Sequence, residues 1–195
     1  MSASVADRVR VREIKVLSDN WYVLRKATFD WRRKDGRWQT QEREAYDRGD
    51  GVALLPYNLA ARTVILTRQF RYPAFSNGHD GLLTEVPAGL LEEADPEARI
   101  RAEVEEEIGY RLGDIREVFD CFMSPGSVTE RLHLFLGEYD ASMRIGAGGG
   151  LEGEGEEIEV VELTFDEAMA QVADGRIRDA KTIILLQHAA LTVFA

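Results

Sequence analysis

Residues 88–110 read AGLLEEADPEARIRAEVEEEIGY and predict a tight turn followed by an acidic helix. We expect the helix to begin at Asp95-Pro96, because aspartate accepts hydrogen bonds from first-turn N–H groups and proline at the first helical position loses none. Gly109 is expected to end the helix, since glycine tolerates the left-handed conformation of a C-terminal cap.

Three glutamates share one face of the predicted helix. Glu103, Glu106 and Glu107 are spaced at i, i+3 and i+4, which brings their carboxylates together. Like charges at this spacing repel and weaken a helix by ~0.2–0.5 kcal/mol per pair. A divalent cation would remove that repulsion, because Mg2+ prefers carboxylate oxygens and usually also binds a substrate phosphate. The alternative is a solvated helix face, which explains most runs of glutamate.

Composition restricts the class of protein. The 195 residues, 45% of them hydrophobic, suit one or two small domains with a real core. A net charge of −11 argues against nucleic acid as a partner. The single Cys121 excludes an internal disulfide and favours a reducing compartment. No apolar run reaches the ~18 residues of a membrane span and no signal-peptide core precedes the first strand, so we expect a cytoplasmic protein without a membrane partner.

The N-terminal residues 1–48 are expected to form a small antiparallel β-sheet. Apolar and polar residues alternate between Val11 and Asp47, as in half-buried strands. Lys34-Asp35-Gly36 predicts a hairpin turn, because Asp-Gly supplies positive-φ positions. A sheet of about three strands needs another surface to cover its apolar face. We favour pairing across a homodimer; the alternative is packing on the rest of its own chain.

Residues 49–195 are expected to form a second domain of mixed strands and helices. Asp47–Gly51 breaks the strand pattern and marks the boundary. Strands are predicted at 52–57, 63–70, 83–87, 115–123 and 131–139, and helices at 164–175 and 179–191. One helix between strands and two at the end predict an α/β/α sandwich.

A second acidic stretch lies far downstream. Residues 146–162 read GAGGGLEGEGEEIEVVE, and glycines let a backbone approach a ligand closely. Glu152, Glu154, Glu156 and Glu157 follow or interrupt these glycines. Such a loop is typical of a lid that brings a base or metal ligand to a site. The alternative is an acidic surface loop without a role.

The end of the opening stretch resembles the Nudix box. Residues 102–110, AEVEEEIGY, match its Arg-Glu-x-x-Glu-Glu-x-Gly pattern in all three glutamates and the closing glycine. Ala102 stands in the position of the box arginine, and Gly89 lies one residue closer to Glu103 than in the pattern. The resemblance implies a Nudix α/β/α sandwich with a mixed sheet, here preceded by the small N-terminal antiparallel sheet, with residues 49–195 as the catalytic domain.

The resemblance extends over nearly the whole chain and points to the nucleoside diphosphate sugar pyrophosphatases, most closely the GDP-mannose pyrophosphatases. Its segments are Leu17–Asn20 with Trp21, Arg43-Glu44, Tyr46–Gly49, RQFR at 68–71, AGLL at 88–91, MSPG at 123–126, Val128–Glu130, AGGG at 147–150, and Ile177–Asp179 with Lys181-Thr182. ADP-ribose pyrophosphatases share fewer of these segments, although the acidic loop at 154–157 resembles theirs. Substrate choice between the two groups therefore stays open.

The resemblance implies a cation site for Mg2+, with Mn2+ as a substitute. Its ligands would be Glu103, Glu107, Glu156 and the main-chain carbonyl of Ala88, with Glu106 as a further ligand or a partner behind them.

The resemblance also implies a substrate site for a nucleotide sugar. Trp21 would stack on the nucleobase, as an aromatic face does at small entropic cost, and the N-terminal sheet would thereby serve both dimerisation and base contacts. The ribose, sugar and phosphates would be held by Arg43, Glu44, Arg71, Ala88, Gly89, Leu90, Glu130 and Lys181. The position of Lys181 independently favours a ligand contact, since a cation in the first turn of a helix is unfavourable for the helix dipole.

The reaction implied is Mg2+-dependent hydrolysis of a pyrophosphate bond. Glu103 and Glu107 would serve the catalytic metal, and Glu154 would be the base that activates water. GDP-mannose would give GMP and mannose 1-phosphate; ADP-ribose, the alternative, would give AMP and ribose 5-phosphate. An alternative of another class is a Nudix-fold ligand sensor without hydrolysis, since fold does not settle function.

Overall fold

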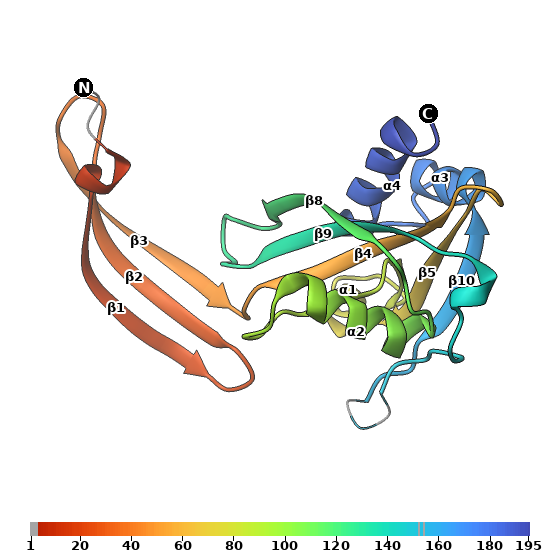
Figure 1. Cartoon of the computed structure of the whole chain (residues 1–195). Coiled ribbons are helices and arrows are strands. Elements are labelled where there is room, and N and C mark those ends of the chain that lie inside the picture. The colour runs from red at the N-terminus through yellow and green to blue at the C-terminus, as the bar shows by residue number, and fades with distance from the viewer. Residues whose placement is uncertain (1–3, 152, 154) are drawn as a thin grey trace. The chain divides into compact units, whose positions relative to one another are not determined.

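A computed structural model describes residues 4–151, 153 and 155–195 of the chain. The chain divides into two compact units (Figure 1). Unit 1 comprises the residues up to Gly49 together with Phe122–Glu130, and unit 2 comprises Asp50–Cys121 and Arg131–Ala195.

Unit 1 is built on a three-stranded antiparallel sheet, as far as the described residues go. A short 3-10 helix, η1 (Val5–Arg8), precedes β1 (Val9–Asp19), β2 (Val23–Arg32) and β3 (Trp38–Asp47), which pair in the order β1-β2-β3. Gly36 closes the predicted hairpin turn with φ +85°, a conformation that glycine adopts without strain. The predicted N-terminal antiparallel sheet is confirmed.

The apolar side chains of β1 are exposed. Val11, Ile14 and Val16 each expose more than half of their surface. A sheet of three strands gains little stability from such an uncovered face. The pairing of this sheet in a homodimer remains a prediction.

A segment from later in the chain completes unit 1. Ser127 O accepts a hydrogen bond from Tyr46 N at 2.8 Å, and Thr129 N donates to Tyr46 O at 3.1 Å. The segment Phe122–Glu130 thus lies against the end of β3, a return that the predicted boundary after residue 48 does not anticipate.

Unit 2 contains a mixed sheet, seven-stranded in the residues described. Its strands are β4 (Gly51–Asn58), β5 (Thr63–Phe70), β6 (Leu82–Glu85), β7 (Ala88–Leu90), β8 (Ile115–Phe122), β9 (Arg131–Glu138) and β10 (Glu159–Thr164). The order is β10-β5-β4-β9-β8, with β6 on β5 and β7 on β4. Strands β4 and β9 are parallel, whereas β5 is antiparallel to β4, β6 and β10.

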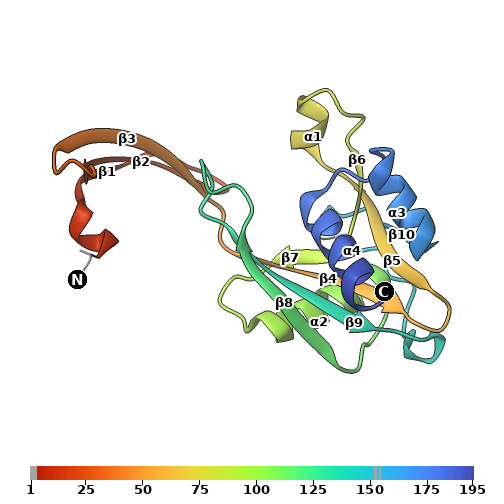
Figure 2. The ribbon, with the colours of Figure 1, turned by 90° about the horizontal axis from the view of Figure 1, so that it is seen from above.

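Helices cover both faces of this sheet (Figures 1 and 2). They are α1 (Tyr72–Ser76), α2 (Pro96–Ile108), α3 (Phe165–Ala173) and α4 (Ala180–Thr192); a second 3-10 helix, η2, spans Ala141–Met143. Val52 and Leu54 of β4 pack in one buried cluster with Ile100 and Val104 of α2. Alternate residues of a strand face opposite sides of the sheet, so the β4 residues that alternate with Val52 and Leu54 face α4. The predicted α/β/α sandwich is confirmed.

Two short elements depart from the sequence-based expectations. Strand β10 overlaps the end of the stretch expected as a loop and the predicted start of the next helix; it pairs with β5 from Glu159 opposite Arg68 to Thr164 opposite Thr63. Because residues 160 and 161 are both valine, the segment shows no alternation of apolar and polar residues that would predict a strand. It becomes a strand because it pairs with the open edge of β5. Strand β7 replaces the expected turn at Ala88-Gly89, because it pairs with β4. Within the described residues, no helix is long and apolar enough to cross a bilayer.

Candidate active site

Helix α2 has the bounds that its sequence predicts. The Asp95 side chain caps it by accepting hydrogen bonds from Glu97 N and Ala98 N, both at 3.1 Å. Gly109 ends it in the left-handed conformation with φ +74°. Local chemistry therefore fixes both ends of this helix.

Two of the three box glutamates face the sheet. Glu103 is 5% exposed and Glu107 1% exposed, while Glu106 is half-buried. Burial of a carboxylate is costly unless hydrogen bonds or positive charge compensate it. A solvated helix face therefore does not describe Glu103 and Glu107.

Strand β7 fits closely against these carboxylates. Ala88 N donates a hydrogen bond to Glu107 Oε2 at 3.3 Å. A Cβ on residue 89 would collide with the Glu103 carboxylate, so any other residue there would displace that side chain. Arg99, one turn before Glu103, donates from Nε to Leu90 O at 3.0 Å and pairs with Glu103. The three predicted residues 88–90 thus lie directly on the glutamate face of α2.

The glycine-rich segment binds the C-terminal end of α2. Gly149 N donates to Glu107 O at 2.9 Å, and Gly150 N donates to Glu106 O at 3.2 Å. These bonds satisfy carbonyls that a helix end leaves open. At Gly148 (φ +71°) a Cβ would collide with the α2 backbone. Residues 148–150 are therefore held against the box helix by backbone hydrogen bonds, and Gly148 allows the close approach because it has no side chain.

The glycine-rich segment leads to Glu156, whose negative charge acts on Glu107. Burial, followed by the charges of Glu103 and Glu156, raises the pKa of Glu107 to about 9. Glu156 Oε2 also accepts a hydrogen bond from Leu151 N at 3.0 Å. Glu152 and Glu154, the predicted base, lie outside the described residues.

The chemistry of this group fits a hard divalent cation. Carboxylates that are crowded and buried attract positive charge, and carboxylate oxygens are the ligands that Mg2+ and Mn2+ prefer. Among the side chains that the structure describes, no three of His, Cys, Asp and Glu converge closely enough to ligate one ion. The fit of the site to a cation rests on burial, charge and donor type.

A buried ion-pair cluster lies beside the glutamates. Glu85 at the end of β6 accepts hydrogen bonds from Arg71 Nε at 2.9 Å and Nη2 at 3.1 Å, and from Lys181 Nζ at 2.5 Å. Lys181 also lies 3.0 Å from Asp179, the N-cap of α4. Burial acts to lower the pKa of Arg71, but the hydrogen bonds and charge of Glu85 outweigh burial and raise it, and the charge of Glu107 adds to this. The two clusters are therefore within electrostatic reach of each other.

Glu85 ties together two cations that the sequence predicts separately as substrate contacts. Burial acts to raise its pKa, but the charges and hydrogen bonds of Lys181 and Arg71 outweigh burial and lower it. Sequence reasoning gives Glu85 no role. The available signal is a single acidic residue at the end of a short apolar strand, three residues before Ala88-Gly89.

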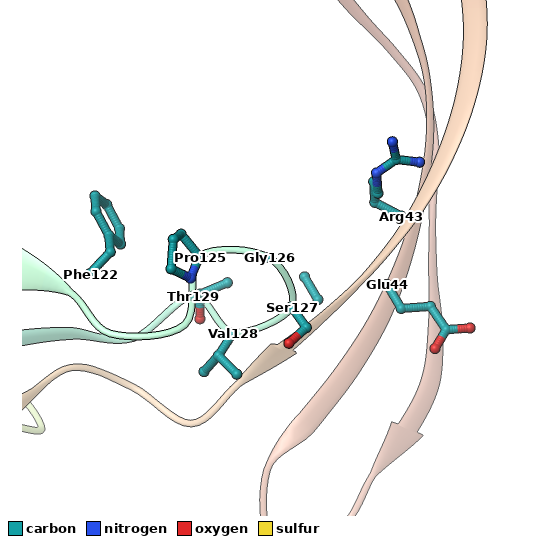
Figure 3. A pocket seen from close by; sticks show the side chains of 9 residues that line it. Arg43, Glu44, Phe122, Pro125, Gly126, Ser127, Val128 and Thr129 are labelled. Atoms are coloured by element: carbon teal, nitrogen blue, oxygen red, sulfur yellow. The ribbon is translucent and has the colours of Figure 1, made fainter. Parts of the chain in front are cut away.

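Unit 1 contains a separate cavity of about 480 Å³. Its lining comes from β3 and from the returning segment: Arg43, Glu44, Ala45, Phe122, Pro125, Gly126, Ser127, Val128 and Thr129. Figure 3 shows the Arg43 and Glu44 side chains leaving β3 in different directions. Phe122 and Pro125 are lining residues that sequence reasoning misses, because only the return of this segment to β3 brings them there.

The other predicted residues of unit 1 lie outside the lining of this cavity. Trp21 is 85% exposed, with its ring centroid 6.3 Å from that of Tyr22. Glu130 lies 3.5 Å from Arg48, whose guanidinium lies over the Tyr22 ring. The roles of Trp21 and Glu130 remain predictions.

A mixed sheet between helices, with buried glutamates on the helix that follows an Ala-Gly strand, defines the Nudix class of folds. The chain belongs to the Nudix family: the family model described as NUDIX domain matches residues 47–186. A second model, described as GDP-mannose pyrophosphatase NudK N-terminal domain, matches residues 8–46. The family predicted from the box is confirmed.

Similar proteins match along most of their length. The GDP-mannose pyrophosphatase of Pectobacterium atrosepticum is 55% identical over 182 residues, which is 93% of either chain. That of Klebsiella pneumoniae subsp. pneumoniae is 50% identical over 92% of this chain and 90% of its own. That of Cronobacter sakazakii is 51% identical over 89% of this chain and 91% of its own.

Proposed function

We propose that the protein is a divalent-cation-dependent pyrophosphatase that hydrolyses GDP-mannose to GMP and mannose 1-phosphate. The observation that carries the proposal is the match of residues 8–46 to the N-terminal domain of GDP-mannose pyrophosphatase. A generic Nudix domain does not account for that part of the chain. The similar proteins named GDP-mannose pyrophosphatase match most of this chain, and that of Pectobacterium atrosepticum is 55% identical to it over 93% of its length.

The proposed cation site uses the buried end of α2. Mg2+, or Mn2+ in its place, would be held by Glu103, Glu107, Glu156 and the carbonyl of Ala88, with Glu106 behind them. When bound, the cation supplies charge neutralisation for the pyrophosphate during bond cleavage. The raised pKa of Glu107, about 9, supports this proposal, since a carboxylate in such a place requires a proton or a cation for charge balance.

The chain's own cations are proposed to bind the phosphates. The guanidinium of Arg71 can donate paired hydrogen bonds to phosphate oxygens, and Lys181 adds a second positive charge 2.5 Å from the same Glu85. Glu154 is proposed to take the proton from the attacking water, a contribution of ~10²–10⁴-fold for a positioned base. Gly89 and Leu90 would complete the phosphate contacts.

The nucleoside and the sugar are proposed to be recognised by residues of the N-terminal sheet and the segment beside it. Arg43 and Glu44 line the unit 1 cavity and can hydrogen-bond ribose and phosphate oxygens. Trp21 is proposed to stack on the base, and its large exposed face supports that role. Glu130 would add a contact to the sugar.

A homodimer through the N-terminal sheet is part of the proposal. The exposed apolar side chains of β1, including Val11, Ile14 and Val16, support it. Light scattering should give twice the chain mass, and Ile14→Asp should shift the protein towards monomer. A monomeric wild-type protein at micromolar concentration would contradict this part. The absence of paired cysteines also supports a reducing compartment, and we propose the cytoplasm.

ADP-ribose is the second candidate substrate, because the acidic loop after Gly150 resembles that of ADP-ribose enzymes. A ligand sensor is the third candidate, because Ala102 replaces the box arginine. Turnover of GDP-mannose, ADP-ribose and other sugar nucleotides with Mg2+ separates the three. Preference for ADP-ribose would refute the GDP-mannose assignment, and tight binding without any turnover would indicate a sensor.

A pair of matched variants tests the site itself. Glu107→Gln should reduce Mg2+-dependent turnover by ~10²-fold or more, because it removes a ligand charge. Glu93→Gln, the same chemical change at an exposed position before α2, should leave turnover unchanged. Full activity in Glu107→Gln would refute the proposed cation site.

A further inference from the structure

The box helix of this chain lacks an arginine at the position where the Nudix pattern has one. Ala102 occupies that position, directly before Glu103, and its methyl group offers no hydrogen bond. The carboxylate of Glu103 is nevertheless almost fully buried. A buried carboxylate of this kind needs a partner to fix its orientation.

The neighbouring Arg101 does not supply this partner. It pairs with Glu97 one turn earlier, with Nη2 2.8 Å from Oε1. Its Nη1 donates to Leu112 O at 3.0 Å and to Gly113 O at 2.7 Å. Arg101 therefore fastens α2 to the segment that follows the helix.

Arg99 is the cation that reaches Glu103. Its Nη2 pairs with Glu103 Oε1, and its Nε donates to Leu90 O at 3.0 Å. The Arg99 side chain is 28% exposed and that of Glu103 is 7% exposed, so water weakens this pair less than a surface ion pair. One planar guanidinium thus joins the box glutamate to the backbone of β7, which a lysine could not do with the same geometry.

Helix stability does not explain an arginine at this position. A cation near the N-terminal end of a helix opposes the helix dipole. The order Arg before Glu at i, i+4 is also the weaker orientation for an ion pair on a helix. The contact with Leu90 and the burial of Glu103 are what the side chain contributes.

Side chains of α2 form hydrogen bonds to both ends of β7, and Arg99 forms one of them. Arg99 holds the carbonyl of Leu90, and Glu107 Oε2 accepts from the N–H of Ala88. Between them, Gly89 leaves the space that the Glu103 carboxylate occupies. The backbone of residues 88–90 and the two buried carboxylates are therefore fixed in one geometry.

We propose that Arg99 is a positioning residue of the cation site, which orients Glu103 and fixes the Ala88–Leu90 backbone against α2. This inference rests on the cation site of the proposed function, but not on the identity of the substrate. Positioning and simple charge predict opposite effects of removing Arg99. Loss of a positive charge beside Glu103 would by itself strengthen cation binding, whereas loss of orientation weakens it.

The test measures Mn2+ binding to the whole chain without substrate, by calorimetry and by electron paramagnetic resonance. Arg99→Gln should bind Mn2+ ~10–100-fold more weakly, the usual effect of removing a residue that orients a metal ligand. Arg101→Gln removes the same charge from the same helix and should keep wild-type affinity. Circular dichroism checks that both variants are folded.

Arg99→Lys covers the case in which Arg99→Gln does not fold. It keeps the charge but lacks the planar fork, and should still bind Mn2+ several-fold more weakly. Wild-type or tighter binding in the folded Arg99 variants overturns the proposal, as does equal weakening in Arg101→Gln. Hydrolysis of GDP-mannose is measured separately: weakened Mn2+ binding in a protein that does not hydrolyse GDP-mannose supports the positioning role and refutes the substrate. A wild-type protein that binds no Mn2+ overturns both.

Discussion

Replacement of Glu85 by glutamine perturbs the most buried ion-pair cluster of the site. Glu85 accepts hydrogen bonds from Arg71 and from Lys181. The glutamine amide removes the negative charge, and its nitrogen is a donor that faces another donor. Two cations then lose their common partner inside unit 2.

The expected loss of stability follows from the partners that remain. Removing one member of a buried ion pair typically costs about 3–5 kcal/mol. Asp179 stays 3.0 Å from Lys181 Nζ, and the Arg71 side chain is 40% exposed and can be hydrated. We therefore expect the lower end, about 3 kcal/mol, which lowers the Tm of a chain of this length by about 6–12 °C.

The pH dependence provides a sharper signature. Because the pKa of Glu85 is lowered in the folded protein, its contribution to stability is fully present above the unfolded value of ~4.3 and is lost as pH falls through the folded pKa. The difference between wild type and Glu85→Gln should thus be constant near neutral pH. It should shrink as pH falls below the unfolded value of ~4.3, because the unfolded wild-type chain then takes up a proton at Glu85, and it should vanish once the pH passes the lowered pKa of the folded protein.

Urea unfolding can be followed separately in the two units. The α-helices of the described residues all belong to unit 2, so far-UV circular dichroism reports the perturbed part. The three tryptophans, at 21, 31 and 38, all belong to unit 1, so fluorescence reports the other. Glu159→Gln is the control, because its pair with Arg68 is exposed and should contribute ~0–1 kcal/mol.

Two results would refute the reasoning. The first is equal stability of Glu85→Gln and wild type at pH 7 by circular dichroism. The second is a difference that persists unchanged at pH 3, since loss of a charge pair cannot explain it.

Three further substitutions have distinct expected outcomes. Gly89→Ala should weaken Mn2+ binding by ~10-fold or more in calorimetry, because the added methyl group displaces the Glu103 carboxylate; unchanged affinity would contradict the close fit. Tyr139→Phe should lower the free energy of unfolding in urea by ~1–2 kcal/mol, since it removes the 2.6 Å hydrogen bond to Glu162; a stabilised variant would contradict this. Trp21→Ala should raise the KM for GDP-mannose with little change in Tm, because the side chain is 85% exposed; a Tm drop without a KM change would mean a structural role.

Features that depend on neighbouring residues were predictable from the sequence. Helix α2 has both of its predicted ends, set by the side chain of Asp95 and by the left-handed Gly109. The hairpin between β2 and β3 turns at the predicted Asp35-Gly36. The Nudix family was also predictable, because its box is a short pattern of residue types.

Features that depend on distant segments were not predictable. Strand β10 exists because β5 offers an open edge, and Phe122 reaches the unit 1 cavity because its segment returns to β3. The sequence places Lys181 at the start of a helix but cannot show that its partner is Glu85, 96 residues away.

Residues 88–110 contain both kinds of feature, those that the sequence predicts and those that it does not. The sequence by itself determined that three carboxylates share one face of a helix with defined ends, because helical periodicity and capping act over a few residues. Only the tertiary structure decided that Glu103 and Glu107 are buried, that Arg99 and not Arg101 faces Glu103, and that Glu156 approaches Glu107. Burial and charge pairing depend on which distant segments pack together, and these decide how the helix carboxylates can act.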